Sequence, residues 1–201
     1  MEAIRPLYLG LVHHPIKNKL GEIVTTSVTN MDIHDISRSC RTFGVKKYFI
    51  ITPLVIQHDL IKRILGHLES DQSAAYNPDR QEALSIAALE NSVSDAVATI
   101  QRLEDTPPLV VVTGANFKQN TLNIEEFRSR LAIDNRPIFL LFGTGWGLSQ
   151  EVVEAAEVKL SPIKSLAGGD YNHLSVRSAV AIYLDRLRGF DQDKELRLSP
   201  L

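Results

Sequence analysis

The chain has 201 residues, 44% of them hydrophobic, which is enough to bury one sizeable core. Its formal net charge of −2 provides no overall basic field for binding nucleic acid, although local basic patches remain compatible with that charge. The single cysteine, Cys40, excludes an internal disulfide and a thiolate metal site, and no signal-peptide pattern or membrane-length apolar run is present, so we expect a cytoplasmic protein.

The first third of the chain predicts two strands and two helices. Apolar runs at 6–12 and 47–52 predict the strands, and the polar, glycine-interrupted stretch 17–30 predicts a long loop. A helix is expected to open at Asp32 and to end at Gly44. Its inward stripe is Ile33, Ile36, Cys40 and Phe43. The second helix, over 54–68, has the inward residues Leu60, Ile61, Ile64, Leu65 and Leu68.

The middle of the chain is harder to assign. The stretch 70–80 is irregular, and 84–89 predicts a short strand whose first residues could instead belong to a helix beginning near Pro78. Either Ser92 or Ser94 can cap the helix that follows. The β-branched run at 109–113 predicts a buried strand.

The last third alternates helices and strands. We expect helices over 124–131, from about Leu148, and from Asn172 to about Arg188, with strands at 138–142 and near 158–160. Strands that are apolar on both faces and alternate with helices predict an α/β fold, with a parallel sheet covered by helices on both faces. No linker interrupts the pattern, so residues 1–201 are expected to form one domain.

Three loops at strand ends are the candidate ligand site, because parallel sheets bind ligands beyond the carboxyl ends of their strands. They are 113–116, 143–148 and 160–163. The second, in PIFLLFGTGWGLSQE, has three glycines that would let backbone approach a ligand closely. It reads G-x-G-x-G rather than G-x-G-x-x-G, and no acidic residue ends the next strand, so a dinucleotide fingerprint is disfavoured. A purely structural turn remains an alternative.

The combination of these segments resembles the SPOUT class of RNA methyltransferases. The resemblance is carried by the glycine loop, by Leu-Ser-Pro-Ile at 160–163 and by YNHLSVRSAVAIYLDRL at the last helix. Upstream, DISRSCRTFGV at 35–45 looks like the first motif of that class. The run YNPDRQEAL at 76–84, with VTGAN and YNHLSVRSA, is similar to a small TrmD-like family within it.

This resemblance implies a deep trefoil knot over about 109–190, an exception to the rule against knots. It also implies S-adenosylmethionine as cofactor, RNA (tRNA or rRNA) as substrate, a homodimer with the first and last helices near its interface, and no metal. The residues it assigns to the cofactor are Thr113, Gly114, Ala115, Phe142, Gly143, Thr144, Gly145, Trp146, Gly147, Leu148, Leu160, Pro162, Ile163, Tyr171, Asn172, His173, Leu174 and Val176.

Residue roles beyond the cofactor are assigned with alternatives. Arg38, Asp170 and His173 are the catalytic candidates, although a solvated face would also explain the arginine, and Asp170 or Asn172 could instead cap the last helix. The residues assigned to RNA are His34, Arg38, Arg41, Asn77, Arg80 and Arg177. Lys46 and Lys47 extend this basic strip. His13, His14 and 77–80 would line the substrate side across a dimer, or simply form loop structure.

The chain departs from the class at Trp146, near which many SPOUT proteins carry a glutamate, and at Ser175, where an asparagine is frequent. Trp146 could stack on a base or serve packing alone. The best interpretation is an RNA methyltransferase that uses S-adenosylmethionine. The alternatives are a catalytically silent module that binds the cofactor and RNA, favoured by the missing glutamate, and a doubly wound nucleotide or flavin enzyme, favoured only by the α/β pattern.

Overall fold

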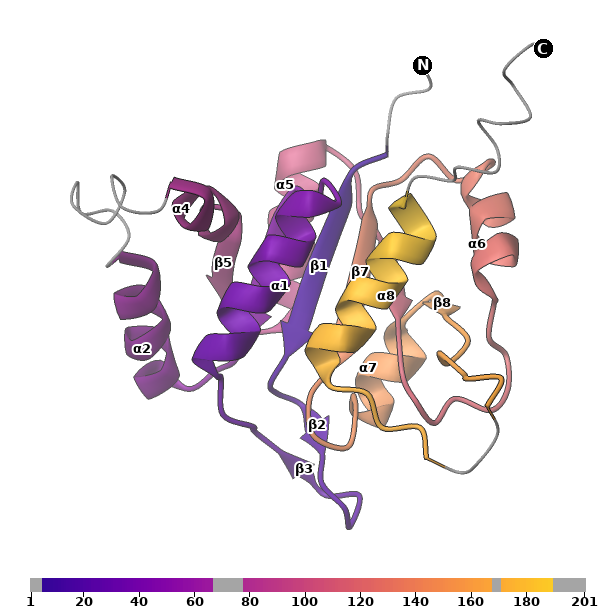
Figure 1. The fold of residues 1–201 in the computed structure, drawn as a ribbon, viewed down its shortest axis with the longest axis horizontal. Coiled ribbons are helices and arrows are strands. Elements are labelled where there is room, and N and C mark those ends of the chain that lie inside the picture. Colours follow the sequence, from indigo (N-terminus) through magenta and orange to yellow (C-terminus); the bar gives the residue numbers. More distant parts are fainter. Residues whose placement is uncertain (1–4, 67–77, 168–170, 190–201) are drawn as a thin grey trace.

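A six-stranded parallel sheet forms the centre of the protein in the computed structural model, which describes residues 5–66, 78–167 and 171–189 (Figure 1). The strands are β1 (Leu7–Val12), β4 (Lys47–Ile51), β5 (Ala87–Glu90), β6 (Leu109–Val112), β7 (Ile138–Gly143) and β8 (Val158–Lys159). Their order is β5-β4-β1-β7-β6-β8, and each neighbouring pair runs parallel. The first strand therefore lies inside the sheet, between β4 and β7.

Helices cover both faces of this sheet, as Figure 1 shows, and the predicted α/β class is confirmed. They are α1 (Asn30–Thr42), α2 (Val55–Gly66), α4 (Pro78–Leu84), α5 (Val93–Glu104), α6 (Ile124–Leu131), α7 (Gln150–Ala155) and α8 (Val176–Arg188). The strand β1 alternates between two cores: Leu9 joins the core under α1 and α8, and Tyr8 joins the core under α5 and α7. Each core buries apolar surface from strand and helix together, which is the main stabilisation of such layers.

Two helix starts differ from the prediction because of capping. The first helix begins at Asn30 rather than Asp32, because the Thr29 side chain accepts a hydrogen bond from the Asp32 N–H and so caps it. The last begins at Val176 rather than Asn172, because Ser175 caps it by accepting from the Ser178 N–H. Asn172 therefore does not cap the helix, and 171–175 lies before it without regular secondary structure.

The stretch 17–30 is not simply a loop. A short antiparallel hairpin of β2 (Ile16–Lys17) and β3 (Ile23–Val24) projects from the carboxyl end of β1 (Figure 1). Its strands have two residues each, too few to leave a periodic signal in the sequence. In α2, Ile61 is buried as expected but Leu60 is 46% exposed, while Leu68 lies outside the described residues. In the part of the chain that the structure describes, no helix is long and apolar enough to cross a bilayer.

Candidate functional site

A large cavity opens at the carboxyl edge of the sheet, with a volume of about 1030 Å³. Two of the three predicted loops supply much of its wall, together with the irregular segment 171–175 before α8. The residues assigned from the sequence that line it are Thr113, Gly114, Ala115, Phe142, Gly143, Thr144, Gly145, Trp146, Gly147, Leu148, Ile163, Asn172, His173, Leu174, Val176 and Arg177. Segments far apart in the sequence thus meet at the edge where parallel sheets bind ligands.

The glycine loop after β7 folds tightly on itself. A Cβ added at Gly143 would lie 2.6 Å from the Leu148 backbone nitrogen, and Gly147 has φ +100°, a conformation that other residues adopt only with strain. The hairpin fastens the loop from outside: the Lys17 N–H donates to the Gly147 carbonyl at 2.9 Å, and the Trp146 N–H donates to the Lys17 carbonyl at 3.2 Å. The loop is therefore fixed by its neighbours as well as by its own turns.

The loop after β6 is tied to the segment before α8. The Thr113 hydroxyl donates to the Leu141 carbonyl at 3.0 Å, which holds the start of this loop against β7. The Asn172 side-chain amide lies 3.4 Å from the Ala115 carbonyl oxygen, which it can reach as a donor. The predicted loop 113–116 and the segment 171–175, which was predicted as the start of the last helix, thus meet at one cavity.

Sequence reasoning missed the contribution of the N-terminal half, because it placed all three ligand loops in the C-terminal half. Lys17, Thr26, Ser27 and Asp32 also line the cavity. Asp32 is buried and accepts a hydrogen bond from Arg177 Nη1 at 2.6 Å, and the Thr29 hydroxyl donates to its other oxygen at 2.6 Å. The available signal was the threonine three residues before an aspartate, a pattern typical of a helix start.

His13 is buried next to Thr26, which lines the cavity. His13 follows β1 and has no exposed surface, and its Nδ1 is hydrogen-bonded to the Thr26 hydroxyl at 3.1 Å. Burial lowers the pKa of His13 to about 4, only partly offset by the charge of Asp32 and the contact with Thr26. The expectation that His13 lines the substrate side is therefore wrong: it is a neutral histidine inside the protein.

Several assigned residues lie away from the cavity lining. Leu160 is fully buried in the core, Pro162 does not line the cavity, and Tyr171 is 85% exposed and stacks edge-on against His173, with ring centroids 5.3 Å apart. Asp170 and Asn77 lie outside the described residues.

Four residues assigned to RNA lie on α1 and α4, away from the cavity lining, namely His34, Arg38, Arg41 and Arg80, whereas Arg177 lines the cavity. Arg38 is exposed, Arg41 forms an ion pair with Glu82, and Arg80 Nη2 lies 2.9 Å from His34 Nε2. The pKa of His34 is lowered, first by burial and then by the charge of Arg80. None of these four residues lines the cavity of its own chain, and their assignment to RNA stays a prediction.

The cavity lining suits the cofactor that the sequence predicts. Phe142, Leu148, Ile163 and Val176 offer apolar surface for an adenosyl group, and the glycine loops offer backbone polar groups. Which of these residues touch the cofactor stays a prediction. Among the described residues, no group of three or more His, Cys, Asp or Glu side chains is placed to hold a metal ion.

Several known proteins resemble this chain in sequence or in fold. The chain is 41% identical over 185 residues to a tRNA (guanine-N(1)-)-methyltransferase of Oleidesulfovibrio alaskensis, covering 92% of this chain but only 42% of that protein. It is 35% identical to an uncharacterised protein of Aquifex aeolicus, covering 90% of this chain and 87% of the relative. A TrmH/SpoU tRNA modifying enzyme of A. aeolicus shares the fold, with a TM-score of 0.54 at 16% identity over 97% of this chain and 79% of that one.

These likenesses confirm the SPOUT resemblance of the fold. The chain spans less than half the length of the methyltransferase relative from O. alaskensis, so more than half of that relative lies outside the match. The model of one protein family, described as SAM-dependent RNA methyltransferase, matches residues 6–189. This chain therefore belongs to that family of SAM-dependent RNA methyltransferases.

Proposed function

We propose that this chain binds S-adenosylmethionine in the cavity at the carboxyl edge of the sheet and directs its methyl group to RNA. The observation that carries the proposal is the convergence of the loops after β6 and β7 with the segment before α8 on one large cavity. Membership of the family supplies the class of reaction.

The residues of the chain would mainly bind and orient the reactants. When bound, S-adenosylmethionine supplies a methyl group on a cationic sulfur, an electrophile that reacts once donor and acceptor are aligned. Phe142, Leu148, Ile163 and Val176 would hold the adenosyl group against the sheet edge. A proton acceptor is needed only where the acceptor atom carries a proton. His173, exposed at the cavity, and Asp170 are the candidates for that role.

The RNA and the assembly belong to the same proposal. Transfer RNA is the substrate class we favour, since the O. alaskensis relative is named for it, although that name describes a protein more than twice as long as the match. We further propose a homodimer that acts in the cytoplasm, in which Arg38 on the exposed side of α1 faces the partner's cavity, and a C-terminal knot as in other SPOUT proteins.

Cofactor binding can be tested by thermal unfolding and calorimetry. S-adenosylmethionine or S-adenosylhomocysteine at about a hundredfold its dissociation constant should stabilise the fold by roughly 2.7 kcal/mol. NAD and flavin serve as controls. Stabilisation by either control and none by the S-adenosyl compounds would overturn the proposal in favour of a nucleotide or flavin enzyme.

Catalysis needs a second experiment. Incubation with labelled S-adenosylmethionine and RNA purified from a strain that lacks the gene should incorporate label into RNA. RNA from the parent strain should accept less, because its sites are already modified. Tight cofactor binding with no incorporation into either RNA would favour the silent module, which the absence of an acidic residue from the glycine loop already supports.

A further inference from the structure

The only tryptophan of the chain, Trp146, stands out because it is 53% exposed at the cavity while large aromatic side chains such as Tyr8, Phe49 and Phe139 are fully buried. Packing, one of the two roles considered for Trp146, does not account for an indole that leaves half of its surface in water. Exposed aromatic side chains beside a cavity are typical of recognition surfaces.

The backbone that carries Trp146 is held in place. Its N–H donates to the Lys17 carbonyl, and Gly147 next to it accepts from the Lys17 N–H. On its other side, the Thr144 hydroxyl donates to the Val12 carbonyl at 3.1 Å, which ties the loop to the end of β1. A side chain on a backbone that is already ordered loses less conformational entropy on binding, which favours its use as a contact surface.

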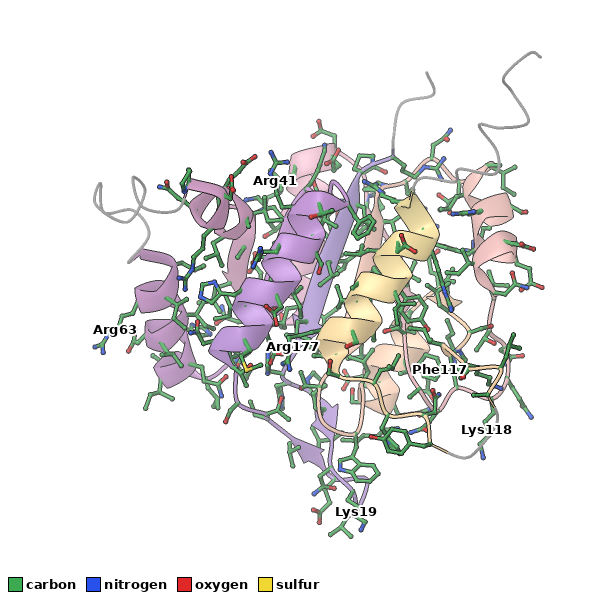
Figure 2. The ribbon with its side chains drawn as sticks, viewed as in Figure 1. Lys19, Arg41, Arg63, Phe117, Lys118 and Arg177 are labelled. Atoms are coloured by element: carbon green, nitrogen blue, oxygen red, sulfur yellow. The ribbon has the colours of Figure 1, made fainter. Side chains whose placement is uncertain are left out.

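The cavity that Trp146 lines is basic and partly aromatic. Among the described residues that line the cavity, the charged ones are Lys17, Lys118, Lys159, Arg177 and Asp32. Asp32 and Arg177 pair with each other, so three lysines give the cavity a positive charge, in contrast to the chain as a whole at −2. The lining also contains the aromatic rings of Phe117, Phe142 and Tyr183. Figure 2 shows Phe117, Lys118 and Lys19 at the same end of the molecule, where β1 ends.

We propose that Trp146 stacks on an unpaired base of the RNA substrate at the entrance of the cavity, while Lys17 and Lys118 contact the neighbouring phosphates. A base can lie flat on an indole only after it has left its own stack, and lysines follow the backbone without reading the sequence. The proposal rests on the proposed function and narrows its substrate to a nucleotide in a single-stranded segment or loop. It reassigns Trp146 from the cofactor to the RNA.

Because Trp146 is the sole tryptophan, its fluorescence reports on this contact directly. The full chain, saturated with S-adenosylhomocysteine, is titrated with a single-stranded RNA oligonucleotide and with the same strand in a perfect duplex. We expect quenching by the single strand and little by the duplex. Quenching by S-adenosylhomocysteine alone, with no further change on adding RNA, would place the indole against the cofactor and overturn the proposal.

Affinity gives a second, independent measurement. Trp146→Ala should weaken binding of the single strand about 5- to 100-fold, the usual contribution of one stacked base, and Trp146→Phe should recover part of it. Leu166→Ala, which shortens a fully exposed apolar side chain outside the cavity lining, is the matched control and should leave the affinity unchanged. Unchanged RNA affinity in Trp146→Ala would overturn the proposal.

The outcomes separate this proposal from the proposed function. If Trp146→Ala transfers the methyl group with the wild-type KM for RNA, the proposed function stands and the stacking role of Trp146 is rejected. Quenching by single-stranded RNA in a protein that calorimetry shows not to bind S-adenosylmethionine would retain the stacking role and reject the function.

Discussion

Asp32 and Arg177 are 145 positions apart in the sequence and form the most buried ion pair at the cavity. Arg177 Nη1 donates to Asp32 Oδ1 at 2.6 Å, and its Nε lies 3.4 Å from an oxygen of Asp35. Figure 2 shows Arg177 between the first turns of α1 and α8. Because Asp32 is the less exposed partner, its carboxylate depends on the guanidinium for compensation inside the protein.

Replacing Arg177 should therefore cost stability. We expect Arg177→Gln to lower the free energy of unfolding by about 1–3 kcal/mol, because a buried carboxylate would lose its charged donor. Arg186→Gln, an exposed arginine on the same helix, is the matched control and should stay within about 0.5 kcal/mol of wild type. Urea unfolding at neutral pH measures both. The double variant Asp32→Asn, Arg177→Gln completes a double-mutant cycle. If its loss in free energy of unfolding equals the sum of the losses in the two single variants, the two side chains are not energetically coupled.

His13 should make the stability depend on pH. Its pKa in the folded protein, about 4, lies below the ordinary value of 6.5, so the unfolded chain binds the proton first as the pH falls. The contribution of neutral His13 is complete above about pH 6.5, declines between about 6.5 and 4, and is lost below that range. By pH 5 the loss should reach about 2 kcal/mol.

Urea titrations of wild type and His13→Gln from pH 7.5 to pH 4 test this expectation. The free energy of unfolding of wild type minus that of His13→Gln should fall as the pH falls, since glutamine does not titrate. His173→Gln, which alters an exposed histidine, is the control for general effects of losing an imidazole. A difference between wild type and His13→Gln that is independent of pH would contradict a buried neutral His13.

At the scale of elements, the glycine loop depends on the missing side chain of Gly143. In Gly143→Ala the new Cβ would meet the Leu148 nitrogen at 2.6 Å and the Gly147 carbonyl carbon at 3.0 Å, so backbone must move. We expect a loss of about 1–3 kcal/mol and weaker binding of S-adenosylmethionine, measured by urea unfolding and calorimetry. Gly66→Ala at the end of α2 meets nothing within 4 Å and should be nearly neutral. Equal effects of the two changes would reject a special requirement at Gly143.

The elements that the sequence predicts well are those with local signals. The strand predicted at 138–142 is β7, which is one residue longer. The helix predicted over 124–131 has the observed bounds of α6, and Asn123 and Glu126 form a capping box at its start. The hairpin at Ile16–Val24 was missed because its pairing across the turn leaves no repeating pattern in the sequence. Likewise, Asp32 was assigned to the start of a helix, but its place in the cavity depends on α8, which only the folded chain brings near.

At the scale of the whole molecule, the separation of Arg38 from the cavity bears on the assembly. Arg38 lies on the exposed side of α1 and does not line the cavity of its own chain. If it acts, as proposed, in the cavity of a second copy, one subunit can supply the arginine and the other the cofactor site. Two inactive variants with different defects should then restore activity when their subunits mix.

Arg38→Ala and Val176→Trp, whose indole would fill the cavity, are the two variants. Random mixing makes half of the dimers mixed, each with one intact site, so about a quarter of the wild-type methyl transfer should return. The subunits are mixed by unfolding and refolding the two variants together. Each variant that is unfolded and refolded alone is the control and should stay inactive. Mixed dimers that form, as shown by differently tagged subunits, yet remain inactive would contradict a role of Arg38 across the dimer.

The walls of the cavity come from residues near both ends of the chain. Lys17 and Asp32 lie on one side, while Asn172 and Val176 lie on the other, with α8 packed beside α1. During translation, Lys17 and Asp32 leave the ribosomal exit tunnel long before Asn172 and Val176, so the cavity cannot form until the later residues have emerged. The nascent chain has no complete cavity until α8 has emerged and docked against α1, so we expect cofactor binding only after that step.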